Sequence, residues 1–261
     1  MDRITVSKKN HVFINIQTDP GIEMELADHF CFFVPGYKFM PAYKNRMWDG
    51  KIRLFDTRKK QLYSGLFKYM YEFAAARDYE VVVEDNFTYG RPDTIQNIDV
   101  PALIDELHLT AGGAKIEARQ YQQDALEHAL SNRQSLLLSP TASGKSLIIY
   151  MAIRYYLNTY DEGNILLIVP TTSLVEQMYS DFADYSQYDE WDVEENCHKI
   201  YGGKEKYSIK QRVVISTWQS IYKERAPWFE GYGMVIGDEA HNFKAKSLTS
   251  ILEKCCNAKY R

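Results

Sequence analysis

The segment Leu138–Ser146 reads LSPTASGKS and decides the fold class. It follows a short apolar run, Ser135–Leu138, that we predict to be a strand, and it leads into an apolar helical pattern. A strand, a tight loop and a helix N-terminus in this order make a phosphate-binding site, because backbone N–H groups wrap the phosphates and the helix dipole favours negative charge. In this interpretation Lys145 reaches the β- and γ-phosphates of ATP, and the Ser146 hydroxyl helps to hold Mg²⁺.

The loop departs from the usual phosphate-binding pattern at two positions. Ser139 occupies the first position instead of glycine, and Ala142 stands where a glycine is common in such loops. A residue without glycine's conformational freedom restricts the backbone, so we expect an adjusted loop shape. The alternative is a solvated turn before an ordinary helix. The loop residues expected to contact the nucleotide are Thr141, Ala142, Ser143, Gly144, Lys145 and Ser146.

A second motif lies downstream, where the apolar run Met234–Gly237 leads into Asp238-Glu239-Ala240-His241. An acid at the end of a buried strand can hold the Mg²⁺ of a nucleotide, which we assign to Asp238. The acid beside it, Glu239, can orient and deprotonate the attacking water. Two acids in a surface turn would be unremarkable, but after a buried strand and downstream of a phosphate loop they favour catalysis. We therefore predict ATP and Mg²⁺ as cofactors.

The remaining pattern of the second half predicts the architecture. Further near-continuous apolar runs at Asn164–Val169 and Val213–Ser216 alternate with helical patterns, as in parallel strands that are covered on both faces. Such alternation implies a doubly wound α/β sheet that binds ligands at the carboxyl ends of its strands. We place this nucleotide-binding domain at residues 114–261.

The front of the chain is predicted to be a small α/β domain at residues 1–85, followed by a linker at 86–113 with a short helix after Pro101. The expected elements are a strand around Val12–Ile16, a helix from Pro20 (capped by Asp19) to about Phe32, a strand at Lys51–Phe55, a helix around Leu66–Phe73 and a strand at Glu80–Val83. The strands are predicted from alternating apolar and polar residues, and the helices from apolar residues at helical spacing and from the Asp-Pro start.

Taken together, these motifs resemble those of superfamily 2 helicases. The two segments described above are similar to that family's motifs I and II, which implies a RecA-like P-loop NTPase domain with catalytic Lys145, Asp238, Glu239 and His241. In the family, the residue corresponding to His241 couples the ATP state to the nucleic acid. The segment Arg119–Gln122 resembles the Q-motif region, which implies that Gln122 recognises adenine with Arg119 beside it.

Three further segments resemble motifs that contact the backbone of a nucleic acid strand in this family: Val169–Gln177, Tyr201–Gly203 and Val214–Gln219. For Trp218, packing against the sheet is an equal alternative to base contact. The contacts that the resemblance implies are Pro170, Thr171, Thr172, Gln177, Gly202, Gly203, Thr217, Trp218 and Gln219.

The segment Pro41–Asp56 looks like the N-terminal domain of phage UvsW-type recombination helicases. This resemblance implies an ATP-dependent DNA helicase or translocase that acts on branched or forked DNA, and on RNA–DNA hybrids, in recombination, repair and replication. The chain ends at Arg261, where the family leads into motif III and a second RecA-like domain. We therefore expect a fragment with little turnover, because an arginine at the transition state can be worth roughly 10³–10⁵ in rate.

The charge distribution singles out one stretch of the front domain. Lys38–Lys60 contains eight basic and two acidic residues, so it carries +6, and the rest of a chain with net charge −4 carries −10. Such a local basic stripe suggests contact with phosphates. The alternative is a solvated strand face with Trp48 in the core. The predicted DNA contacts are Lys44, Arg46, Trp48, Lys51 and Arg53, with Trp48 or Tyr43 stacking on a base or wedging at a fork.

Length and composition narrow the class of protein and its location in the cell. The 261 residues predict two domains, and no apolar run approaches the ~18–20 residues of a membrane span. The four cysteines have no metal-ligand spacing and indicate reduced thiols in a cytoplasmic protein, in the host cytoplasm if a phage encodes it. We expect a monomer. Two alternatives stay open: the motor half of a restriction or remodelling enzyme, and a non-catalytic nucleic-acid-binding adaptor with a vestigial ATP site.

Overall fold

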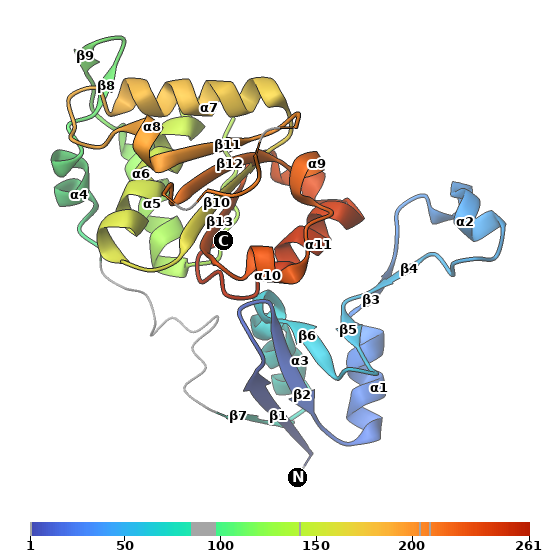
Figure 1. Cartoon of the computed structure of the whole chain (residues 1–261). Coiled ribbons are helices and arrows are strands. Elements are labelled where there is room, and N and C mark those ends of the chain that lie inside the picture. The colour runs from blue at the N-terminus through green and yellow to red at the C-terminus, as the bar shows by residue number, and fades with distance from the viewer. Residues whose placement is uncertain (1, 85–97, 141, 204, 209) are drawn as a thin grey trace. The chain divides into compact units, whose positions relative to one another are not determined.

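The computed structural model describes residues 2–84, 98–140, 142–203, 205–208 and 210–261. The chain divides into two compact units, Met1–Asp93 and Thr94–Arg261, and Figure 1 shows their elements. Each unit has its own hydrophobic core. No helix among the described residues is long and apolar enough to cross a membrane.

The first unit is built on a five-stranded sheet with the order β5-β6-β2-β1-β7. β1 pairs in parallel with β7, and the other pairs are antiparallel. Alternate residues of the two central strands are buried, which the period of two in a half-covered strand requires. The strands are β1 (Arg3–Lys8), β2 (Phe13–Gln17), β5 (Phe55–Asp56), β6 (Gln61–Tyr63) and β7 (Glu80–Val83).

Two helices supply the rest of this core, α1 (Pro20–His29) and α3 (Phe67–Ala75), the latter after the short η2 (Ser64–Leu66). The Asp19 carboxylate caps α1 by accepting the N–H groups of Gly21 and Ile22 at 2.9 and 3.2 Å, so the predicted helix start is confirmed. Cores of this kind are stabilised mainly by the removal of apolar surface from water.

The predicted end of α1 is wrong. The helix stops at His29, and Cys31–Phe33 forms a strand, β3, that pairs antiparallel with β4 (Lys51–Arg53). The apolar run at the helix end fits a helix or a strand equally well, and the distant partner strand decides between them. Beyond β3 the chain forms η1 (Tyr37–Phe39) and α2 (Pro41–Lys44) before it returns through β4. We call residues 31–53 the arm; Figure 1 shows it extending from the five-stranded sheet.

The second unit contains a sheet of four parallel strands in the order β11-β12-β10-β13. Three of them confirm the predicted strands at 164–169, 213–216 and 234–237. The strands are β10 (Asn164–Val169), β11 (Cys197–Ile200), β12 (Val213–Thr217) and β13 (Tyr232–Gly237).

Helices cover both faces of this sheet, as predicted (Figure 1). In β10, Ile165 and Leu167 belong to one core cluster while Leu166 and Ile168 belong to the other. The first face packs against α5 (Gln120–Asn132), α6 (Lys145–Thr159) and α7 (Thr172–Tyr185); the second packs against α9 (Trp218–Ile221), α10 (Ala226–Phe229) and α11 (Lys246–Lys254).

Shorter elements complete this unit. The helix expected after Pro101 is α4 (Val100–Glu106), and its Leu103 packs into the same core as α5 and α6. Gly112 and Gly113, both with positive φ, turn the chain between two short paired strands. The remaining elements are β8 (Thr110–Ala111), β9 (Ala114–Lys115), α8 (Val193–Asn196) and η4 (Ala240–Lys244). The polar stretch at 85–97, which we assigned to the linker, lies outside the described residues.

The predicted strand at Ser135–Leu138 is not formed. Leu136 and Leu138 are 65% and 91% exposed, and the Ser135 N–H donates to the carbonyl of Arg261 at 3.1 Å. In the part of the chain that the structure describes, no strand runs beside the three leucines that follow Ser135. An apolar run becomes a strand only when its backbone groups find a partner, which the local pattern cannot supply.

Candidate functional site

The phosphate loop leads directly into α6, whose first residue is Lys145. Gly144 caps the helix in the left-handed conformation, with φ of 75°. Ala142 also has a positive φ, 62°, which costs a residue with a β-carbon roughly 1–2 kcal/mol. The loop therefore keeps the conformation that glycine would favour at this position and stores some strain. Thr141 lies outside the described residues.

The loop is hydrogen-bonded to α5 through the carbonyl of Ser143. This oxygen accepts hydrogen bonds from the Tyr121 hydroxyl at 2.7 Å and from Nε2 of Gln122 at 3.1 Å. The hydroxyls of Ser139 and Ser143 also bond to each other. A β-carbon on Gly144 would lie 2.4 Å from Nε2 of Gln122, so any larger residue would displace this amide from the Ser143 carbonyl.

Gln122 is buried, and both ends of its amide are bonded to protein. Its Oε1 accepts the N–H of Arg119 at 2.9 Å, while its Nε2 holds Ser143. The structure thus gives Gln122 a role in supporting the phosphate loop. Recognition of adenine by this amide would require exchange of one of these two partners.

The acidic motif meets the loop at the end of β13. The Asp238 N–H donates to the carbonyl of Ile168 at 2.9 Å, which fixes the strand end. Glu239 then turns into the left-handed conformation with φ of 54°. Its carboxylate lies 3.4 Å from Nζ of Lys145 and 3.2 Å from Nδ1 of His241. The structure therefore brings the predicted catalytic Lys145 to Glu239, 94 positions further along the chain, with the neighbouring His241 on the same carboxylate.

Ser146 has a partner that the sequence did not predict. Its hydroxyl lies 2.8 Å from the hydroxyl of Tyr185 at the end of α7. Burial raises the pKa of Tyr185, so this phenol stays protonated at neutral pH. Nothing in the sequence links two residues 39 positions apart. Tyr121, by contrast, lies inside the predicted Q-motif region, and its position there was an available signal.

The donor set suits a nucleotide-bound Mg²⁺. Mg²⁺ in such sites takes one or two protein oxygens and completes its shell with phosphates and water. Ser146 supplies a hydroxyl and Asp238 a carboxylate, both next to backbone that the hydrogen bonds above hold in place. Among the described residues, no group of three or more His, Cys, Asp or Glu side chains could hold a metal by itself.

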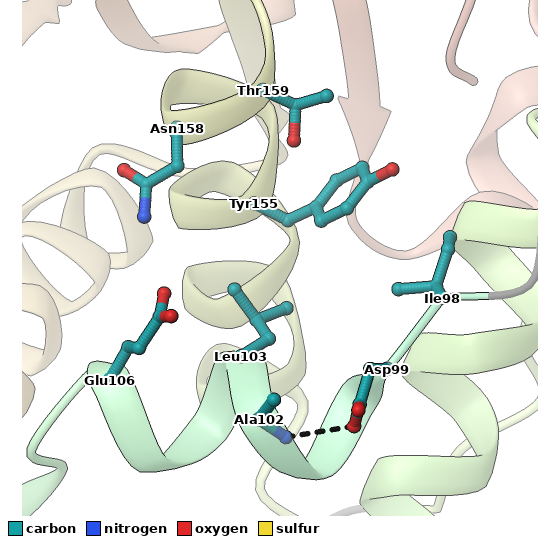
Figure 2. A pocket seen from close by; sticks show the side chains of 8 residues that line it. All are labelled: Ile98, Asp99, Ala102, Leu103, Glu106, Tyr155, Asn158 and Thr159. Carbon is teal, nitrogen blue, oxygen red and sulfur yellow. Dashed lines mark hydrogen bonds between the residues drawn. The ribbon is translucent and has the colours of Figure 1, made fainter.

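A hollow elsewhere in the second unit contains none of the predicted site residues. It has a volume of about 580 Å³ and lies between α4 and α6 (Figure 2). Asp99 at its edge is used as a helix cap, since its carboxylate accepts the N–H of Ala102 at 3.1 Å. We assign no role to this hollow.

The residues implied to contact nucleic acid gather at the carboxyl ends of β10, β11 and β12, which are neighbours in the sheet. Nε2 of Gln219 donates to the carbonyl of Pro170 at 3.5 Å and links two of these ends. Thr217 is buried, and Trp218 packs against the core with its ring 6.0 Å from that of Tyr222. The exposed members of the set are Thr171, Thr172, Gln177, Gly202, Gly203 and Gln219.

The predicted contacts of the arm differ in their surroundings. Trp48 is half-buried and donates its Nε1–H to the carbonyl of Lys51 at 2.9 Å, so it supports the arm. Nζ of Lys51 lies 4.9 Å above the ring of Phe33.

The other basic residues of the arm differ in whether they have an acidic partner. Arg53 pairs with Asp49. Lys44 and Arg46 lie at the tip, where both are in the lining of a basic hollow.

A phosphate loop that opens a helix, with an acidic pair at the end of a parallel strand, defines a P-loop NTPase domain of the RecA-like type. Family models agree with both units: residues 115–261 match "Type III restriction enzyme, res subunit", and residues 3–84 match "DNA helicase UvsW, N-terminal". The chain belongs to the UvsW helicase family, with its second unit in the family of type III restriction enzyme res subunits.

Individual relatives agree with this family assignment. The ATP-dependent DNA helicase uvsW of Enterobacteria phage T4 is 35% identical over 251 residues, which cover 95% of this chain and 48% of the relative. A crystal structure of the UvsW helicase from bacteriophage T4 has a TM-score of 0.85 at 33% identity and covers 99% of this chain and 90% of that chain. The ATP-dependent DNA helicase Hel308 of Methanocella arvoryzae is 24% identical over 56% of this chain and 20% of its own length. This chain thus spans about half the length of the T4 relative.

Proposed function

We propose that this chain is the nucleotide-binding front half of an ATP-dependent DNA helicase or translocase that acts on branched DNA. The observation that carries the proposal is the contact of Lys145 and His241 with Glu239 beside an intact phosphate loop. Its T4 relative is named an ATP-dependent DNA helicase. Branched or forked DNA, and RNA–DNA hybrids, are the substrates that we propose for the complete protein.

Each residue has a separable role in this proposal. Lys145 binds the β- and γ-phosphates, and its contact with Glu239 gives way when a nucleotide enters. Glu239 then orients the attacking water and accepts its proton, while His241 holds that carboxylate through Nδ1. Ser146 and Asp238 would hold Mg²⁺, which neutralises phosphate charge when it is bound.

The exposed edge formed by the ends of β10, β11 and β12 is the proposed track for a nucleic acid strand. It offers hydroxyls at Thr171 and Thr172, an amide at Gln219, and backbone N–H groups at Gly202 and Gly203. Groups of this kind bind phosphates without reading sequence, which a translocating enzyme needs. Gln122 contributes indirectly by holding the phosphate loop, and adenine recognition by Gln122 and Arg119 remains part of the proposal.

A restriction or remodelling motor is the second candidate, because the second unit matches the res-subunit family. The helicase is favoured because the UvsW N-terminal model matches residues 3–84 and the T4 relative aligns with 95% of the chain. A vestigial adaptor is disfavoured by the retained Lys145, Ser146, Asp238 and Glu239. We further propose domains at 1–85 and 114–261 joined by residues 86–113, of which α4 packs into the core of the second unit. We also propose a cytoplasmic monomer, in the host cytoplasm if a phage encodes it.

The test is unwinding of forked DNA by the complete protein, made with Lys145→Ala or Glu239→Gln. We expect both variants to lose unwinding, and Glu239→Gln to lower ATP turnover by roughly 10²–10⁴-fold, as removal of a general base does. Unimpaired unwinding by either variant would contradict the proposal.

A further inference from the structure

Exposed apolar side chains are concentrated in the arm. Among the described residues, six of the large hydrophobic side chains that are exposed lie in this short segment. Two of them at its tip, Phe39 and Met47, are 80% and 79% exposed. Soluble proteins rarely gather such groups without a partner. The six are Phe32, Phe33, Phe39, Met40, Met47 and Ile52.

The tip is nevertheless a folded element. The ring of Tyr37 stacks on Phe33 at 4.7 Å and meets Tyr43 edge-on at 4.8 Å. A β-carbon on Gly50 would lie 2.3 Å from the Tyr37 ring, so the chain closes tightly behind it. Backbone bonds from Met47 and Trp48 to the carbonyl of Ala42, at 2.9 and 3.2 Å, complete the tip. Its exposed groups are therefore presented by a structured support.

Positive charge is concentrated in the same segment. The arm, residues 31–53, contains five basic residues and one acid, so it carries +4. A hollow of about 590 Å³ at the tip is lined by Lys38, Lys44, Arg46 and Met47. Its one acid, Asp49, is paired with Arg53. In the part of the chain that the structure describes, no carboxylate forms an ion pair with these three cations. Apolar groups ringed by cations complement bases flanked by phosphates.

We propose that the arm tip is a wedge for a nucleic acid junction. Phe39 and Met47 insert against the last base pair where strands separate, while Lys38, Lys44 and Arg46 bind the adjacent phosphates. Proteins that unstack base steps use side chains of this type, Phe and Met among them. The inference rests on the proposed function and deepens it, because it replaces Trp48 with Phe39 and Met47 as the groups that meet the bases.

The test uses this 261-residue chain with forked DNA and with plain duplex of the same length, with 2-aminopurine in the last base pair of the fork. We expect binding to raise 2-aminopurine fluorescence, which reports unstacking. Phe39→Ala and Met47→Ala should abolish that rise and weaken fork binding by about 5- to 100-fold, in line with the loss of one base contact. Duplex affinity should change little. Tyr69→Ala and Met24→Ala are matched controls, since both side chains are exposed on helices of the same unit.

Three outcomes overturn the wedge. The first is fork binding with unchanged 2-aminopurine fluorescence, and the second is an unaltered preference for forks in the Phe39→Ala, Met47→Ala double variant. Absence of any DNA binding by this chain would also overturn it, while nucleotide binding would still test the ATP site of the proposed function independently. Because both side chains are exposed, thermal unfolding should be unchanged in the variants, which checks that the tip still folds.

Discussion

The nucleotide site and the arm tip present their functional groups in opposite ways. At the nucleotide site the groups are already paired with one another: Lys145 with Glu239, and Ser146 with Tyr185. At the arm tip, Phe39 and Met47 are about four-fifths exposed on a support that does not cover them.

This difference has an energetic consequence. A ligand that enters the nucleotide site must replace internal contacts, so removal of one partner alters geometry that several residues share. A nucleic acid strand that reaches the arm meets side chains that act separately. The contacts between the cations of the arm and the phosphates are screened by salt. We therefore expect large and specific effects in the first region, and small, additive, salt-dependent effects in the second.

The largest effect on folding stability is expected from Gly144→Ala. The new β-carbon would collide with Gln122 and would hold a left-handed φ of 75°, so we expect a loss of about 1–3 kcal/mol in the free energy of unfolding. Urea denaturation measures this. Ala142→Gly is the matched reverse change. It relieves a positive φ of 62° and should leave stability unchanged or raise it by up to about 1 kcal/mol. Equal destabilisation by both changes would show that the loop is not strained as described.

A smaller effect is expected from Tyr185→Phe, which removes the hydroxyl that contacts Ser146. Loss of one hydrogen bond, typically about 0.5–1.5 kcal/mol, should weaken ATP binding roughly 2- to 12-fold in the presence of Mg²⁺. Binding in EDTA should be unchanged, because the effect acts through the proposed Mg²⁺ ligand. Tyr188→Phe is the control, since that exposed hydroxyl bonds to the Gly113 carbonyl. An equal loss with and without Mg²⁺ would contradict a role in placing Ser146.

The smallest effects concern single phosphate contacts of the arm. Lys44→Ala should lower the slope of log affinity for DNA against log salt by about one. Arg53→Ala should lower it less, because Arg53 already pairs with Asp49 and holds the pKa of that carboxylate below its usual value. Lys68→Ala on α3 is the control. Anisotropy titrations at several salt concentrations measure the slopes. Equal slopes for all three variants would remove the arm from the phosphate-binding surface.

The sequence predicted best where local pattern and burial coincide. β7 and β10 have the predicted bounds. β10 is a continuous apolar run in a sheet that is covered on both faces, and β7 is a short run of valines, which favour strands. The start of α1 was predicted from the Asp19 cap, which is a local interaction. β1 was missed, although Ile4 and Val6 alternate with polar residues.

The errors depend on distant partners. Cys31–Phe33 is a strand because β4 lies beside it, and Ser135–Leu138 is not one because its leucines have no strand beside them among the described residues. The same holds for the sites. Spacing and resemblance selected Lys145 and Glu239, but no pattern could show that Tyr185 meets Ser146, or that Trp48 is used inside the arm while Phe39 is exposed.

The central claim is that Lys145 and Glu239 belong to one nucleotide site, in which Lys145 strengthens ATP binding and Glu239 does not. Calorimetric titration of this chain with ATP and Mg²⁺ tests it most directly, with Lys145→Ala and Glu239→Gln compared in parallel. We expect Lys145→Ala to weaken binding at least about tenfold, because it removes a charge-assisted phosphate contact. Glu239→Gln should bind as tightly as the original chain or more tightly, because it frees Lys145 and removes a negative charge beside the phosphates. Unchanged binding by Lys145→Ala, or equal weakening by both variants, would contradict the claim.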